Sequence, residues 1–148
     1  MESERSLKAH LIEFFELFSE DQIHQLFVKK KTTFARVNGL YSSVVAGGDP
    51  VILIYPDLLK SLRSAYNREA LAILAHEVGH IHNGHFERKV GTIEAQVEAD
   101  LFACELGLSL ELSHFLDRLS NTWEIKIRQS YITSYYYSNE FRAAKIAS

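Results

Sequence analysis

The stretch of sequence that decides the fold is ALAILAHEVGH, residues 70–80 of a chain of 148 residues. Its first six residues are all apolar, and such a run within a helical pattern predicts a buried helix, which we place at residues 67–82. His76 and His80 stand four positions apart, so they share one face of that helix. The sequence therefore predicts two imidazoles side by side on a buried helix.

The five residues His76-Glu77-Val78-Gly79-His80 have the pattern of a metal site. Two adjacent imidazoles can bind one metal ion, and Glu77 beside them can hold and deprotonate a metal-bound water. The buried helix would place the ion at the floor of a cleft, where a low dielectric strengthens its pull on that water. Two ordinary core histidines would instead need a separate partner for each imidazole and for Glu77. We therefore predict a metal site with Zn2+ as the cofactor.

The rest of the chain reads as helices, then strands, then helices, which is an α+β pattern. Asn38-Gly39 is a strong hairpin signal between two segments rich in β-branched and aromatic residues. A continuous apolar segment, residues 51–55, is expected to form the central strand. The predicted strands are 32–37, 40–46 and 51–55, and the predicted helices are 7–18, 19–28, 57–66, 67–82, 92–107, 109–119 and one within 121–146.

Composition limits the classes of partner and compartment. With 47% hydrophobic and 24% charged residues the chain has the balance of an ordinary globular domain. A net charge of −3 gives no reason to expect a nucleic-acid partner. No apolar run approaches the roughly 18–20 residues that span a bilayer, and the polar first residues are unlike a signal peptide. The single cysteine, Cys104, fits a reducing compartment, so we expect a cytoplasmic protein with no membrane span.

Two segments in succession carry a family resemblance. HEVGH at residues 76–80 is followed by VEADLFA at residues 97–103. Together they resemble the gluzincin zinc metallopeptidases, particularly a minimal soluble form of the HtpX/prenyl-endopeptidase family, and they are also similar to the ImmA/IrrE-type peptidases. A strand ending near Tyr55 and a helix leading into residues 69–76 agree with that order. The resemblance covers roughly residues 37–107.

The resemblance implies a zincin-like fold. A small three-stranded meander would pack on the active-site helix and on a second helix that bears a ligand, with helical extensions at both ends. We expect one metallopeptidase-like domain over residues 1–148. Within it, residues 1–31 would be a helical extension, residues 32–107 the gluzincin core, and residues 108–148 a helical C-terminal part.

The third zinc ligand is where this chain departs from the pattern. A catalytic zinc takes three protein ligands, and in the resembled families the third is a Glu four residues before the position of Asp100. That position is Gln96, which offers a neutral carbonyl oxygen. Glu94 and Glu98 lie two positions to either side, about 200° around a helix, so they would serve only if the helix started late or were bulged. We assign the position of the third ligand to Gln96, with Glu98 or Glu94 as the fallback. Three alternatives stay open: Gln96 makes a weaker metal site, the chain is a metal-free relative of these families, or Gln96 has been substituted for a Glu.

Other polar residues are not expected to bind the metal themselves. The resemblance gives Asp100 the task of accepting the free N–H of a ligand histidine, which fixes the tautomer of that histidine. An oxyanion donor is needed, and the spacing selects none of the downstream candidates. His82 and His85 lie at or beyond the end of the helix and are expected at the surface. The candidate oxyanion donors are His114, Arg128, Tyr131, Tyr135, Tyr136 and Tyr137.

The sequence favours an endopeptidase that acts on a protein or peptide. An edge strand from residues 32–46 would bind the extended substrate by strand addition. Three alternatives stay open: a regulatory ImmA-like protein that acts on one specific partner, a pseudopeptidase binding module that follows from Gln96, and an interaction protein whose helical ends, rich in Phe and Tyr, dock a protein partner.

Overall fold

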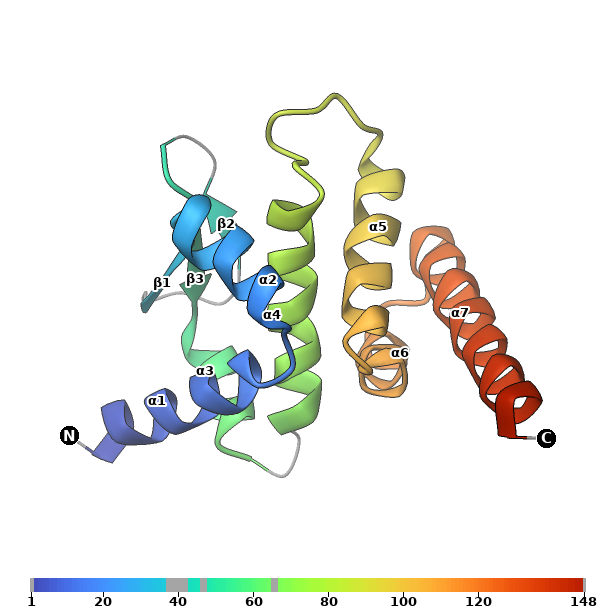
Figure 1. Ribbon diagram of the computed structural model, residues 1–148, viewed down its shortest axis with the longest axis horizontal. Helices are drawn as coiled ribbons and strands as arrows, with labels where there is room; N and C mark the ends of the chain where they lie inside the picture. The colour runs from blue at the N-terminus through green and yellow to red at the C-terminus, as the bar shows by residue number, and fades with distance from the viewer. Residues whose placement is uncertain (1, 37–42, 46–47, 65–66, 148) are drawn as a thin grey trace.

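The computed structural model describes residues 2–36, 43–45, 48–64 and 67–147. Helices precede and follow a small sheet, so the α+β character predicted from the sequence is present, with helices dominating (Figure 1). The elements are α1 Glu2–Phe15, α2 Glu20–Ile23, the π-helix η1 His24–Lys29, β1 Thr33–Arg36, β2 Ser43–Val45, β3 Val51–Ile54, α3 Pro56–Leu62, α4 Asn67–His82, α5 Thr92–Glu105, α6 Ser109–Asp117 and α7 Trp123–Ala147.

The order of the sheet corrects the prediction of a meander. A meander would pair β1 with β2, but the observed order is β1-β3-β2, with β3 parallel to β1 and antiparallel to β2. The strand predicted to be central is central. Its residues Ile52 and Ile54 are buried, and this apolar strand gains most by having a neighbour on each side. Asn38-Gly39, the predicted hairpin turn, lies outside the described residues.

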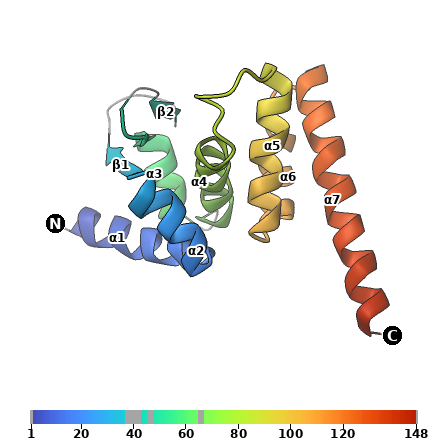
Figure 2. The ribbon, with the colours of Figure 1, turned by 45° about the horizontal axis from the view of Figure 1, so that its top comes forward.

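The helix that the apolar run predicts, α4, runs through the middle of the molecule (Figure 1). It has α5 alongside it in both views (Figures 1 and 2), and it also packs against α3 and α6. Its bounds are those predicted from the sequence, residues 67–82. Ala70, Leu71, Leu74 and Val78 are fully buried, so the helix is held from several sides. The two histidines that follow the apolar run therefore lie on a rigid, desolvated element.

The N-terminal helices are anchored by aromatic packing. Phe14, Phe18 and Phe27 form tilted and edge-to-face contacts with ring centroids 5.0 to 6.0 Å apart. Such aromatic pairs contribute beyond the area that they bury. Ser19 caps α2 through a capping box, and the helix predicted over residues 19–28 divides into α2 and the π-helix η1. Phe18 also contacts Phe102 of α5, so this layer packs on the helix that faces α4.

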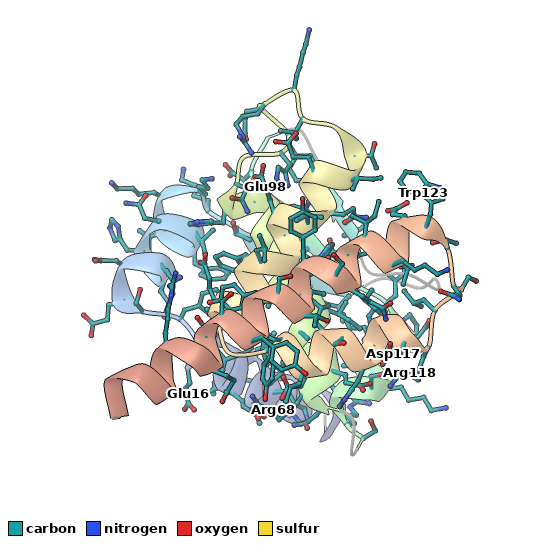
Figure 3. All side chains as sticks on the ribbon, turned by 90° about the vertical axis from the view of Figure 1, so that its right-hand side faces the viewer. Glu16, Arg68, Glu98, Asp117, Arg118 and Trp123 are labelled. Atoms are coloured by element: carbon teal, nitrogen blue, oxygen red, sulfur yellow. The ribbon has the colours of Figure 1, made fainter. Side chains whose placement is uncertain are left out.

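The C-terminal helix α7 closes the other side of the molecule. Figure 3 shows it lying across α5 and α6, with Trp123 at its first residue. Ile132 is buried in the core, whereas Trp123 and Tyr137 are each 67% exposed. In the part of the chain that the structure describes, no helix combines the length and the apolar run that crossing a membrane requires.

Candidate metal centre

The C-terminal end of α4 folds back on itself. Gly84 adopts φ +65°, a left-handed conformation that glycine reaches without steric cost. Its N–H donates to the carbonyl of Ile81 at 3.1 Å, and the N–H of His85 donates to the carbonyl of His80 at 3.1 Å. These two bonds define a Schellman motif, with Gly84 at the left-handed position just past the helix end. The motif places His85 directly over the last turn of the helix, against His80.

The two histidines of the helix face each other. The Nε2 atoms of His76 and His80 are 3.1 Å apart, and the ring planes are perpendicular. His76 is buried, and its Nδ1 lies 2.7 Å from Oδ1 of Asp100 on α5. Asp100 is thus in contact with one of the two histidines of the helix. Arg128 of α7 donates to both oxygens of Asp100, at 2.7 and 2.8 Å.

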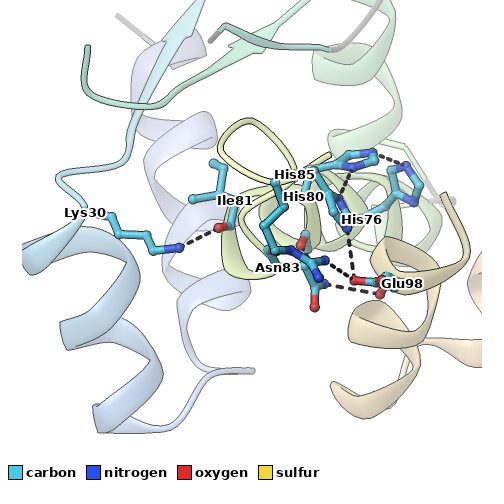
Figure 4. A network of polar contacts seen from close by, with 9 residues as sticks. Lys30, His76, His80, Ile81, Asn83, His85 and Glu98 are labelled. Atoms are coloured by element: carbon cyan, nitrogen blue, oxygen red, sulfur yellow. Dashed lines mark hydrogen bonds and ion pairs between the residues drawn. The ribbon is translucent and has the colours of Figure 1, made fainter. Parts of the chain in front are cut away.

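His80 is held by a second chain of contacts. Its Nδ1 lies 2.8 Å from Nδ1 of His85, and Nε2 of His85 lies 3.1 Å from Oε2 of Glu98 (Figure 4). Arg88 donates to the same Glu98 oxygen at 2.7 Å. The prediction that His85 is a surface residue is wrong, because its side chain is only 4% exposed. His82 is exposed, as predicted.

These contacts determine where the ring protons lie. A carboxylate only accepts, so Asp100 requires N–H at Nδ1 of His76, and Glu98 requires N–H at Nε2 of His85. In a neutral His85 ring, Nδ1 then carries a lone pair and accepts from Nδ1 of His80. Burial, together with the neighbouring His76 and His85, lowers the pKa of His80 to about 4, so His80 is neutral at pH 7. When His76 is also in its neutral form, both facing Nε2 atoms are unprotonated.

Gln96 of α5, the residue assigned to the third-ligand position, lies close to this pair of histidines. Its Oε1 is buried and has no hydrogen-bond partner among the described residues, and its side chain lies beside His80, whose charged form it favours. Two nitrogens that bind one tetrahedral zinc at about 2.0–2.1 Å stand about 3.3 Å apart, close to the observed 3.1 Å. Two imidazole nitrogens and an orphaned amide oxygen fit a zinc ion. Within the described residues, no three His, Cys, Asp or Glu side chains gather as a metal-binding group, and the candidate third ligand, Gln96, is not one of these residue types.

The two fallback ligands lie elsewhere. Glu94 is exposed in the first turn of α5, which begins at Thr92. Glu98 turns to His85 and Arg88 rather than to the facing nitrogens (Figure 4). The hydrogen bond from His85, together with Arg88, holds the pKa of Glu98 below its ordinary value. Glu98 is therefore a charged acceptor for His85, a role that its helical position alone does not indicate.

Glu77 lines a pocket of about 600 Å³ together with His76, Gln96 and Arg128. Burial raises the pKa of Glu77 above its ordinary value, and electrostatic interactions with His76 and Arg128 offset part of the rise. A raised pKa brings a carboxylate closer to the range in which it exchanges protons near neutral pH. The rest of the wall is largely apolar, formed by Leu58, Ile73, Leu112, Phe115 and Leu119.

The structure separates the candidate oxyanion donors. Arg128 lines the pocket. Burial alone would raise the pKa of the neighbouring Asp100, but the hydrogen bonds from Arg128 and His76 outweigh it, so the pKa of Asp100 is lowered. Arg128 uses Nε and Nη2 for Asp100. Tyr131 and Tyr137 are half or more exposed, and His114 is exposed. Neither these three nor Tyr135 and Tyr136 line this pocket.

The helix with paired histidines, its facing second helix and the cleft beside them are the parts of a zinc metallopeptidase of the gluzincin type. Residues 22–143 match the model of peptidase family M48, and the chain belongs to this family. The match extends beyond residues 37–107, to which the resemblance read from the sequence was confined. No curated protein and no solved structure matched the chain.

Proposed function

We propose that the protein is a zinc-dependent endopeptidase in which His76, His80 and Gln96 hold the metal and Glu77 is the general base. The observation that carries this proposal is the pair of Nε2 atoms 3.1 Å apart. When both rings are neutral, these atoms present two lone pairs that repel each other, and one cation bound by both relieves that repulsion. The buried oxygen of Gln96, which has no partner among the described residues, supplies a third donor.

Each of these residues has a separate role in the proposed peptide hydrolysis. Asp100 orients the imidazole of His76 and, by accepting its Nδ1 proton, raises its basicity as a ligand. Glu77 takes the proton of the attacking water and passes it to the leaving amine. Arg128, fixed by Asp100 at the pocket wall, adds positive charge where the carbonyl oxygen becomes negative. Zinc, when bound, supplies Lewis-acid chemistry at the scissile carbonyl and lowers the pKa of water.

The pocket indicates the kind of peptide. Its wall carries Leu58, Ile73 and Phe115 next to Glu77. A pocket of this composition favours a large apolar side chain, because its burial against such residues removes apolar surface from water. The proposed substrate is therefore a protein or peptide with a large apolar residue adjacent to the cleaved bond.

A second function, a pseudopeptidase binding module, is favoured by the same Gln96. A neutral amide binds zinc more weakly than the carboxylate that the resembled families have in this position. A chain with impaired zinc affinity would keep the apolar pocket and bind a peptide without cleaving it.

One experiment separates the two functions. Purified protein is analysed for zinc and assayed on casein and on quenched peptides with a central Phe or Leu, with Glu77→Gln alongside. The matched control is Glu94→Gln, which makes the same charge change at an exposed position. We expect about one zinc per chain and cleavage that Glu77→Gln abolishes and Glu94→Gln retains. Peptide binding without cleavage in the zinc-loaded protein would select the binding module, and cleavage unaffected by Glu77→Gln would exclude Glu77 as the base.

A further inference from the structure

The two histidines of α4 are oriented through two parallel chains of contacts. His76 reaches a carboxylate directly, at Asp100, and that carboxylate is paired with Arg128. The chain from His80 reaches its carboxylate through one extra imidazole, His85, and ends in the pair of Glu98 and Arg88. We infer that His85, Glu98 and Arg88 are positioning residues that hold His80 in its metal-binding tautomer, an inference that rests on the proposed metal site.

The backbone fixes His85 for this task. Gly84 at φ +65° turns the chain, and the N–H of His85 then donates to the carbonyl of His80. Asn83 strengthens the turn, because its amide donates to the carbonyl of Gly79 at 2.8 Å. Arg88 donates through Nε to the carbonyl of Asn83 at 2.8 Å. The segment after α4 is thus tied to the helix end, and the buried imidazole of His85 has a defined place.

This series of contacts acts by deciding which ring nitrogen of His80 carries the proton. A neutral imidazole carries one N–H, so only one of its nitrogens can bind a metal. Glu98 takes the N–H of His85, which leaves His85 as an acceptor toward His80. His80 must then carry its proton at Nδ1 and present a lone pair at Nε2, toward His76. Without His85, the Nδ1 atom of His80 would lose this acceptor, and the Nε2 atom could carry the proton instead.

An ion pair holds this series of contacts in place. The ion pair between Arg88 and Glu98 joins the loop after α4 to α5. The N–O distance of 2.7 Å and the shared Oε2 atom leave Glu98 as a fixed acceptor for His85 (Figure 4). Gln96 and Glu98 stand on the same helix, so α5 carries both the third donor and the carboxylate that orients the second histidine.

The first test uses metal-free wild-type protein. Long-range 15N–1H correlation spectra of the imidazole rings report which nitrogen carries the proton. We expect the Nδ1–H form for His80 and His76 and the Nε2–H form for His85. A His80 that carries its proton at Nε2 in the metal-free protein would overturn the inference without any mutation.

The second test measures Co2+ affinity by chelator competition together with the visible spectrum of the cobalt protein. His85→Ala should weaken cobalt binding by about 10–100-fold, the usual loss when a group that orients a metal ligand is removed. His85→Gln should recover most of the affinity, because a glutamine carbonyl can accept from Nδ1 of His80. The control is His82→Ala, which removes an exposed histidine from the same helix end and should bind cobalt as wild type does.

The outcomes separate this inference from the proposed function. Wild-type protein that binds no cobalt or zinc removes the metal site, and the positioning role with it. Tight wild-type binding that His85→Ala leaves unchanged, in affinity and in spectrum, overturns the positioning role alone. Thermal unfolding of the metal-free variants identifies loss of fold, and the tautomer of His80 in wild type decides the question if His85→Ala does not fold.

Discussion

Gly79 of α4 lies against the backbone of Ala99 in α5, so closely that a side chain would not fit between the two helices. A Cβ atom at residue 79 would stand 2.8 Å from the carbonyl oxygen of Ala99 and 2.9 Å from its Cα. Backbone atoms cannot rotate away as the end of a side chain can. This contact sets the separation of the two helices that carry the proposed metal donors, since Gly79 adjoins His80 and Ala99 adjoins Asp100.

Gly79→Ala should therefore destabilise the protein even though alanine favours helix. Overpacking costs about 1–3 kcal/mol, and the helix propensity of alanine returns up to about 1 kcal/mol. Thermal or urea unfolding measures the difference. Gly91→Ala is the control, because no atom lies within 4 Å of the Cβ that it adds. A Gly79→Ala protein at least as stable as Gly91→Ala would contradict the close contact.

Arg128 should contribute to the stability of the fold chiefly because it compensates the charge of the buried Asp100. Asp100 is fully buried, and Arg128 donates to both of its oxygens. Arg128→Met leaves the carboxylate uncompensated, at an expected cost of about 3–5 kcal/mol in unfolding free energy. Adding Asp100→Asn removes the charge while keeping an acceptor for His76, so the double variant should be more stable than Arg128→Met alone. Urea denaturation with EDTA present measures this coupling, and strictly additive losses would exclude it.

Gln96→Glu should tighten zinc binding. The substitution places a charged oxygen where the buried amide oxygen now stands, and zinc prefers carboxylate to amide. We expect the zinc dissociation constant, measured by chelator competition, to fall by at least about tenfold, or about 1.4 kcal/mol. Gln25→Glu makes the same change at an exposed position of η1 and should leave affinity unaltered. Unaltered affinity in Gln96→Glu, with weaker binding in Glu98→Ala, would mean that the third ligand is Glu98.

Cys104 should be unreactive in the folded protein. The thiol is free and buried, and burial raises its pKa to about 11. At pH 8, three units below that value, about one thiolate per thousand thiols is present, and only the thiolate attacks disulfide reagents. Reaction with DTNB should therefore be slow in native protein at pH 8 and fast in urea, and below pH 8 slower still. Rapid native labelling would contradict the burial of this side chain.

The sequence by itself determined the elements that local pattern controls. The bounds of α4 follow from an uninterrupted apolar run and a glycine just past its end, and the spacing of His76 and His80 places them on one face wherever the helix packs. The central position of residues 51–54 follows from their apolar continuity. Asp100 and Gln96 were found through the resemblance of their helix to gluzincin helices.

Other features were decided by contacts between distant segments. The pairing of β1 with β3 depends on which strand gains most by burial on both edges. The hairpin signal at residues 38–39 favoured the pairing of β1 with β2, which are not neighbours in the described sheet. Arg128 lies 28 positions from Asp100, so no local spacing singles it out. Its contact with Asp100 exists only because α7 packs against α5.

His85 lies between these two cases. Gly84 indicated where α4 ends, and a Schellman motif places the residue after the glycine back over the helix, so the contact with His80 had a local signal. Its burial had none, because Glu98 and Arg88 cover it only when α5 and the intervening loop fold against α4. The sequence thus determined the paired histidines, since helical periodicity is local. The tertiary structure decided how each one is oriented, since a ring proton is fixed by whichever acceptor the packing brings to it.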